Sequence, residues 1–306
     1  MTPEDSQLTI IIPAYNEAAS LPQLLHELLP FAQLKNFKVI IVNDGSSDDT
    51  QAVLERNTTL TKNISIINHK VNRGYGGALK SGINKARTQY CITIDADGQH
   101  SLSDIDRLLN TITETNADLV VGSRKGNSES GYYREFGKTI LRRVAKLLMP
   151  FKIYDINSGI KIYDTKLAQK YIQICPDSMA FSDVITLTFV YQRNLVLEIP
   201  VKINQRKAGK STIGLRTALD TLIEIINIVV LFNPMRIFLP LSFIFILASI
   251  IWEIPIFLRG QGVSIGALLG FMTGIIFFLL GLIAEQLGNI RRLSINDNIP
   301  PKSNNS

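Results

Sequence analysis

Two apolar runs near the C-terminus constrain the fold of this 306-residue chain more than any other feature. The first covers residues 237–258 and the second covers residues 263–284, with Gly260-Gln-Gly262 between them. An α-helix needs about 20 apolar residues to cross roughly 30 Å of hydrocarbon, and each run is long enough. We therefore expect two membrane-spanning helices joined by a tight turn. The alternative is a pair of helices buried in a soluble core.

Basic residues lie outside these runs rather than between them. Arg236 precedes the first run, Arg291 and Arg292 follow the second, and the turn contributes only Arg259. Because cytoplasmic segments of membrane proteins carry the excess of Lys and Arg, the pattern predicts an integral membrane protein with both termini in the cytoplasm.

The remaining sequence has the composition of a soluble protein. Cys91 and Cys175 are the only cysteines, which argues against a disulfide framework and favours a reducing compartment. The chain carries a net charge of +6, and the pattern gives no reason to expect a nucleic-acid partner. We predict four segments: a folded domain at 1–216, an amphipathic juxtamembrane helix at 217–233, a transmembrane hairpin at 234–290 and a cytoplasmic tail at 291–306.

Short apolar runs alternate with amphipathic stretches through the first part of the chain. The predicted strands cover residues 8–12, 39–42, 64–67, 90–94 and 119–122, and the intervening helices include residues 18–34 and 102–115. This alternation predicts an α/β fold with a mostly parallel, Rossmann-like sheet covered by helices on both faces. Such sheets bind ligands outside the carboxyl ends of their strands.

An acidic pair follows the predicted strand at 90–94. Residues two apart on an extended chain point the same way, so Asp95 and Asp97 can address one point in space. Two converging carboxylates need a cation, and their hard oxygen atoms suit Mg²⁺ or Mn²⁺ with a diphosphate as a further ligand. A polar turn is the alternative, because Asp and Gly are common where strands end. The position of the pair at a strand end favours the ligand-binding interpretation.

Four spaced motifs resemble the family 2 glycosyltransferases of the GT-A fold. They are Pro13-Ala-Tyr-Asn-Glu17, Asn43-Asp-Gly-Ser-Ser-Asp48, Asn72-Arg-Gly-Tyr-Gly-Gly77 and Asp95-Ala-Asp-Gly-Gln-His100. Together with two later motifs, Asp155-x-x-Ser158-Gly159 and Arg206-x-x-Gly209-x-Ser211, the resemblance covers residues 8–211. The later motifs and the hairpin are similar to the branch of dolichol-phosphate mannosyltransferases and bactoprenol glucosyltransferases.

The resemblance implies roles for individual residues. It places the donor among Pro13, Tyr15, Glu17, Asp44, Asp95, Gln99, Arg206 and Ser211. It assigns the metal, Mg²⁺ or Mn²⁺, to Asp95, Asp97 and Gln99, and catalytic roles to Asp97, Arg124 and Arg134. Arg134 and Lys138 would contact the acceptor phosphate, although some relatives carry a small hydroxyl residue at position 138.

The chemistry of a lipid phosphate acceptor agrees with a cation-rich site. A phosphate monoester has a second pKa of about 6, so it is mostly ionised at neutral pH and needs no general base. It does need cations that hold two anions together, and the basic stretch at 124–146 suits that role, unless it is an ordinary solvated face. Asp183 is the one acid that remains a candidate base, with a helix N-cap as its alternative.

We therefore predict a membrane-anchored, inverting glycosyltransferase that moves a hexose from a nucleotide sugar, with UDP-glucose favoured, onto polyprenyl phosphate. Three alternatives remain: a processive polysaccharide synthase, a GDP-mannose enzyme of the dolichol-phosphate type, and a non-catalytic anchor that binds nucleotide sugar. The synthases share a Gln-x-x-Arg-Trp segment, whereas the only tryptophan here, Trp252, lies in an apolar run. Gly266, Gly270 and Gly274 recur every four residues, so we also expect a homo-oligomer formed through the hairpin.

Overall fold

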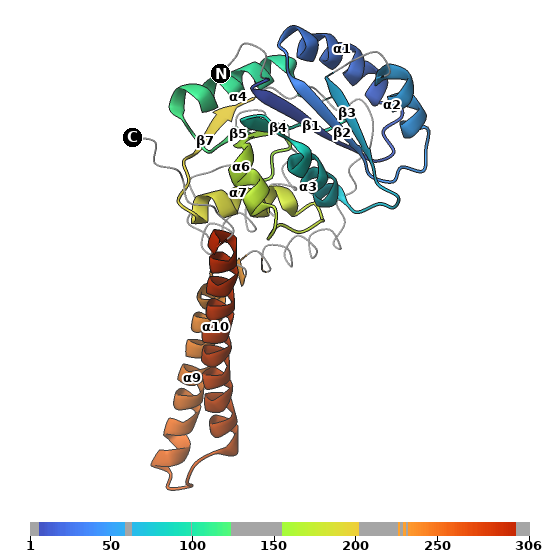
Figure 1. Ribbon diagram of the computed structural model, residues 1–306. Coiled ribbons are helices and arrows are strands. Elements are labelled where there is room, and N and C mark those ends of the chain that lie inside the picture. Colours follow the sequence, from blue (N-terminus) through green and yellow to red (C-terminus); the bar gives the residue numbers. More distant parts are fainter. Residues whose placement is uncertain are drawn as a thin grey trace, which may run out of the picture. The chain divides into compact units, whose positions relative to one another are not determined.

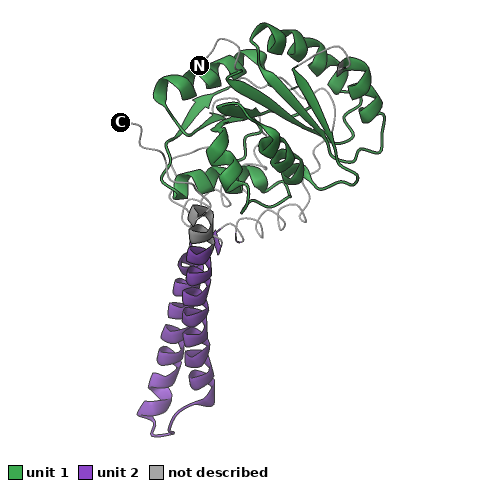
Figure 2. Cartoon of the chain, in the orientation of Figure 1, with its two compact units in different colours: residues 1–130, 152–211 green, residues 131–151, 212–306 purple. Residues whose placement is uncertain are grey.

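The computed structural model describes residues 6–58, 63–98, 100–123, 155–201, 226, 229–230 and 232–297. The chain forms two compact units (Figure 1 and Figure 2). The first contains residues 1–130 and 152–211, and the second contains residues 131–151 and 212–306.

The first unit contains a seven-stranded sheet in the described residues, with the order β3-β2-β1-β4-β6-β5-β7. The strands are β1 (Leu8–Ala14), β2 (Lys38–Asn43), β3 (Ile64–Asn68), β4 (Tyr90–Thr93), β5 (Leu119–Ser123), β6 (Lys161–Asp164) and β7 (Val196–Pro200). Strand β6 is antiparallel to β4 and β5, while every other pairing is parallel. The prediction of a mostly parallel sheet is confirmed.

Helices lie on both sides of this sheet (Figure 1). They are α1 (Leu21–Leu34), α2 (Thr50–Thr58), α3 (Tyr75–Lys85), α4 (Leu102–Thr115), α6 (Thr165–Tyr171) and α7 (Phe181–Tyr191). The cap of α4 shows how the sequence sets such a boundary: the Ser101 side chain accepts a hydrogen bond from the Ser103 amide.

The central strands explain why the binding loops converge. Residues 8–12 of β1 are all buried, as expected for a parallel strand covered on both faces. Ala14 at the end of β1 pairs with Asn43 at the end of β2, and Ile11 pairs with Thr93 at the end of β4. The loops that follow these three strands therefore leave the same edge of the sheet side by side.

The second unit contains a hairpin of two long helices, α9 (Met235–Leu258) and α10 (Ile265–Asp297). Both have the length and apolar character needed to cross a membrane. The prediction of two spans is confirmed, although α10 begins two residues later than expected and continues past residue 284. Glu253, an acid within the first predicted span, accepts the amide hydrogen of Ser264 at 3.1 Å and so caps the start of α10.

The glycines of the second span have partners within the hairpin. A Cβ atom at Gly270 would lie 2.3 Å from Ser249 Oγ, and one at Gly274 would lie 2.5 Å from Ile246 Cγ1. Close packing of α9 on α10 thus uses two of the three glycines predicted to mediate self-association. The homo-oligomer stays a prediction, and the four-residue spacing of these glycines no longer supports it.

Candidate active site

A cavity of about 350 Å³ lies at the carboxyl ends of β1, β2 and β4. It is lined by Pro13, Ala14, Tyr15, Glu17, Asp44, Asn72, Tyr75, Ala78, Asp95, Ala96, Asp97 and Met179. Six of these residues were predicted as site residues from the sequence: Pro13, Tyr15, Glu17, Asp44, Asp95 and Asp97.

Hydrogen bonds connect the loop after β1 to the segment after β2. Asn16 Oδ1 accepts the Ser47 amide hydrogen at 2.8 Å, and the Glu17 amide donates to Thr50 Oγ1 at 2.9 Å. The Glu17 carboxylate accepts a short hydrogen bond from Ser20 Oγ. Tyr15 remains 48% exposed at this wall, so its ring is available to a flat ligand.

Asp44 is a buried acid whose first oxygen is already occupied. Asp44 Oδ1 accepts the Arg73 amide hydrogen at 2.9 Å and contacts His69 Nδ1 at 2.6 Å. Because an ionised carboxylate only accepts, His69 Nδ1 is the donor, and His69 Nε2 contacts Ser81 Oγ at 2.9 Å. None of the described residues donates to Asp44 Oδ2, which leaves one acceptor for a ligand in the cavity.

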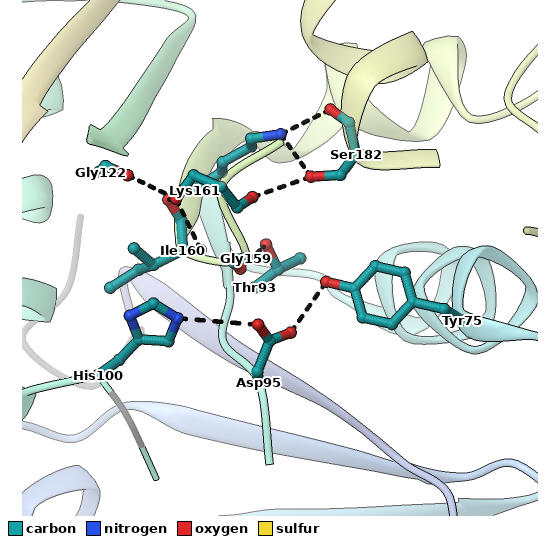
Figure 3. Close-up of polar contacts among 10 residues, drawn as sticks. Tyr75, Thr93, Asp95, His100, Gly122, Gly159, Ile160, Lys161 and Ser182 are labelled. Carbon is teal, nitrogen blue, oxygen red and sulfur yellow. Dashed lines mark hydrogen bonds and ion pairs between the residues drawn. The ribbon is translucent and has the colours of Figure 1, made fainter. Parts of the chain in front are cut away.

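Asp95 is held from two sides (Figure 3). Tyr75 donates its hydroxyl hydrogen to Asp95 Oδ1 at 3.0 Å, and His100 Nε2 lies 3.8 Å from Asp95 Oδ2, an ion-pair separation rather than a hydrogen bond. Burial raises the pKa of the Asp95 carboxyl, but His100, the Tyr75 hydroxyl and the Lys161 charge outweigh burial and lower it overall. Asp95 is therefore ionised at neutral pH.

The two acids reach the cavity by a different geometry from the one expected. Strand β4 ends at Thr93, so Asp95 and Asp97 lie in the following turn and not on an extended strand. Gly98, in the left-handed region with φ of 70°, continues this turn. Both acids line the cavity nonetheless, as predicted.

The other predicted site residues are not assembled by the described structure. Asp183 lies in the first turn of α7 and does not line the cavity, and Ala180 occupies the N-cap position. Six further residues lie outside the described part of the chain: Gln99, Arg124, Arg134, Lys138, Arg206 and Ser211.

Tyr75 and Met179 line the cavity but were not predicted. Tyr75 belongs to the motif at 72–77, which carried the family resemblance without giving this side chain a role. Met179 is 63% exposed in the segment before α7, and no sequence pattern marks it.

The acid pair fits a divalent metal that is completed by a ligand. Among the described residues, no group of three or more His, Cys, Asp or Glu side chains forms a ready-made metal site. Mg²⁺ often takes only one or two carboxylates from the protein and fills its coordination with phosphate oxygens and water. Asp95 and Asp97 suit that arrangement, because both face the same cavity.

The mostly parallel sheet, the cavity at its carboxyl edge and the paired acids define a glycosyltransferase of the GT-A type. The model for "Glycosyl transferase family 2" matches residues 9–173, and the chain belongs to this family. The model for the "GtrB C-terminal hairpin" matches residues 233–290, which contain α9 and the apolar part of α10. The chain is accordingly a membrane glycosyltransferase.

Two named relatives share much of its length. The undecaprenyl-phosphate 4-deoxy-4-formamido-L-arabinose transferase of Proteus mirabilis is 26% identical over 301 residues, covering 93% of this chain and 89% of the relative. A dolichyl-phosphate beta-glucosyltransferase of Trichomonas vaginalis is 30% identical, covering 70% of this chain and 72% of the relative.

A solved structure has the same fold. It is the glucosyl-3-phosphoglycerate synthase of Mycobacterium tuberculosis in complex with Mn²⁺, UDP-glucose and phosphoglyceric acid. The TM-score is 0.54 at 16% identity, covering 73% of this chain and 80% of that one.

Proposed function

We propose that this membrane-anchored, inverting enzyme transfers a hexose from a UDP-sugar, with UDP-glucose favoured, onto polyprenyl phosphate. The observation that carries the proposal is the acid pair Asp95 and Asp97 in a cavity of a chain that also contains an apolar hairpin. The two relatives are named for transfer to undecaprenyl phosphate and dolichyl phosphate, which supports a polyprenyl phosphate acceptor here.

The geometry around Asp44 favours uridine over guanosine in the donor. Guanine presents two adjacent N–H donors, which are best matched by both oxygens of one carboxylate, whereas uracil presents a single N–H donor. Since Asp44 Oδ1 already accepts from His69 and from the Arg73 amide, only Oδ2 is left for the base, and a pairing that needs both oxygens is disfavoured. This count supports a UDP-sugar and argues against the GDP-mannose alternative.

The residues can promote transfer without a general base. The acceptor phosphate is ionised at neutral pH, so the enzyme has to place it in line with the departing diphosphate and offset charge. Asp95 and Asp97 would hold Mg²⁺ or Mn²⁺ together with Gln99, and the ion would offset negative charge on the leaving diphosphate. We assign the acceptor phosphate to Arg134 and Lys138, with Arg124, Arg206 and Ser211 near the donor phosphates. Asp183, away from the cavity, is not required as a base.

The hairpin serves to keep the active site at the surface where the lipid phosphate lies. A polyprenyl tail confines its phosphate to the membrane plane, so anchoring removes a search between water and membrane. We propose that both termini and the catalytic unit are cytoplasmic, because the basic residues flank the hairpin and the turn carries only Arg259.

A reconstitution assay tests the function. Purified full-length protein in liposomes would receive labelled UDP-glucose or GDP-mannose, with Mn²⁺ and either undecaprenyl phosphate or undecaprenol. We expect lipid-extractable label only with UDP-glucose and undecaprenyl phosphate. Transfer to undecaprenol, or release of free sugar without transfer in the presence of undecaprenyl phosphate, contradicts the proposal. A preference for GDP-mannose would overturn the proposed donor and the interpretation of Asp44, and would leave the proposed acceptor in place.

A further inference from the structure

Lys161 on β6 is a charged side chain that is completely buried in the α/β unit, and Figure 3 shows its contacts with Ser182. Its Nζ atom donates three hydrogen bonds of 2.6 Å, to the carbonyl of Ile156 and to the carbonyl and hydroxyl of Ser182. An ammonium group has three donors, and the acceptors of these three bonds are uncharged. Because burying an ammonium group is costly, a neutral side chain here would be the simpler solution for packing alone.

The bonds of Lys161 secure the loop that precedes β6. Ser182 Oγ, which accepts from Lys161, donates in turn to the Ser158 carbonyl at 2.9 Å. Thr93 Oγ1, from the end of β4, donates to the Gly159 carbonyl at 3.2 Å. The loop at 156–160 is thus tied to β6, to the start of α7 and to the strand that leads into the acid pair.

This loop lies directly against the first acid of the pair. A Cβ atom at Gly159 would lie 2.0 Å from Asp95 Oδ2 and 2.7 Å from Asp95 Cγ, so the carboxylate occupies the space that a side chain would take. Tyr75 holds the other oxygen, Asp95 Oδ1. The loop and Tyr75 together confine the carboxylate, and a shift of the loop would release it.

On the basis of the proposed function, we propose that Lys161 is a positioning residue for sugar transfer. Its buried ammonium group fixes the loop at 156–160 against Asp95 and so holds that carboxylate where the donor diphosphate and its metal bind. Lys161 does not line the cavity itself; it acts on Asp95 through the loop, in addition to the favourable interaction between its charge and that carboxylate. A purely structural role would affect all ligands alike, whereas this role affects the diphosphate end of the cavity and spares the end near Asp44.

The test compares Lys161→Met with the wild-type full-length protein in detergent. Isothermal titration calorimetry would measure the binding of UDP with Mn²⁺ and, separately, the binding of uridine. We expect UDP with Mn²⁺ to bind at least about tenfold more weakly, the scale seen when groups that orient metal ligands are removed. Uridine should bind within about twofold of wild type, and kcat should fall while the KM for acceptor is maintained.

Matched variants keep the test decisive if Lys161→Met fails to fold. Ser182→Ala removes one acceptor of Lys161 and the bond to Ser158, whereas Ser182→Thr keeps a hydroxyl and should restore binding of UDP with Mn²⁺. Thr188→Ala removes another buried hydroxyl of α7, whose one partner among the described residues is the Val184 carbonyl, and should leave binding unchanged.

Two outcomes overturn the proposal. In the first, Lys161→Met and Ser182→Ala both bind UDP with Mn²⁺ as tightly as Thr188→Ala does. In the second, both variants lose as much affinity for uridine as they lose for UDP with Mn²⁺. A wild-type protein that binds UDP with Mn²⁺ but transfers no sugar would instead contradict the proposed function. The binding measurements would still decide the role of Lys161 in that case.

Discussion

The α/β unit and the hairpin contain the same kinds of apolar side chain but place them in opposite ways. Ile10, Ile11 and Ile12 of β1 are fully buried, whereas Leu258 and Ile265 of the hairpin are 78% and 76% exposed. Leaving apolar surface in water costs about 25 cal/mol per Å², so the hairpin requires lipid as its solvent. The comparison separates two tasks: the first unit arranges charged groups for chemistry, and the second determines where that chemistry occurs.

Buried polar groups also have different roles in the α/β unit and in the hairpin. In the first unit, buried polar groups such as Lys161 and Asp44 hold loops around the cavity. In the hairpin, Ser249 bonds to the Phe245 carbonyl of its own helix, and Glu253 caps the neighbouring one. These two side chains find their partners within the hairpin, as surroundings of lipid favour, whereas Glu285 Oε2 is buried and has no hydrogen-bond partner among the described residues.

The largest expected effect, an all-or-none labelling pattern, concerns the orientation of the hairpin in the membrane. A maleimide that cannot cross membranes should label Gly260→Cys from outside the cell and should not label Ser303→Cys. The native thiols do not interfere, because burial raises the pKa of both Cys91 and Cys175 to about 12 and neither is accessible. The reverse labelling pattern would show that the catalytic unit lies on the other side.

The next largest effect is expected in the catalytic unit. Asp97→Ala should lower kcat by about 10² to 10³, because on the order of 3 to 4 kcal/mol of charge stabilisation is lost. Activity of the wild type should also stop in excess chelator. Asp106→Ala is the control, since Asp106 pairs with Lys35 at the surface. Full turnover with chelator present would show that the reaction does not require a divalent metal ion.

Removing the hairpin should separate the two tasks. A chain ending at Arg216 should retain binding of the nucleotide sugar but transfer to polyprenyl phosphate in bilayers at least about tenfold more slowly, because the phosphate stays in the membrane plane. Transfer to a short, water-soluble analogue should change far less. Equal rates on the bilayer acceptor for both chains would refute the anchoring role.

Packing within the hairpin is tested by a pair of glycine substitutions. Gly274→Leu places atoms against Ile246 and the Ser242 carbonyl, and overpacking of this kind costs about 1 to 3 kcal/mol. Gly266→Leu is the control, because its Cβ atom would meet only Ser264 Oγ at 3.6 Å. Thermal unfolding in detergent should show a lower midpoint for Gly274→Leu alone. If Gly266→Leu is as damaging, this glycine has a partner outside the hairpin.

The smallest predicted effect concerns Tyr75. Tyr75→Phe removes the hydrogen bond to Asp95, worth about 0.5 to 1.5 kcal/mol, so kcat should fall roughly 2- to 13-fold. Tyr171→Phe removes another partly buried hydrogen bond, in which the Tyr171 hydroxyl accepts from Asn194 away from the cavity, and should leave kcat unchanged. Equal kcat values in the two variants would mean that Tyr75 does not help to hold Asp95.

The sequence predicted the parts of the fold that depend on local pattern. The strands before the binding loops are continuous apolar runs, and the polar residues at their ends, including Asp44 and Asp95, were placed at one edge for that reason. Strand β6 was missed, because Lys161 and Asp164 interrupt its apolar pattern. The burial of Lys161 depends on acceptors at Ile156 and Ser182, and the pairing of Asp44 with His69 spans 25 residues. Such contacts arise only in the folded chain.

The identity of the reaction product tests the central claim most directly. Wild-type protein in liposomes would be incubated with UDP-glucose, Mn²⁺ and undecaprenyl phosphate, and the lipid extract analysed by mass spectrometry. We predict one product, the acceptor plus a single hexose joined through the phosphate, and no such product with Asp97→Ala. A ladder of longer saccharides would indicate a processive synthase, and unchanged lipid with intact UDP-glucose would indicate a non-catalytic anchor. Either result would contradict the account.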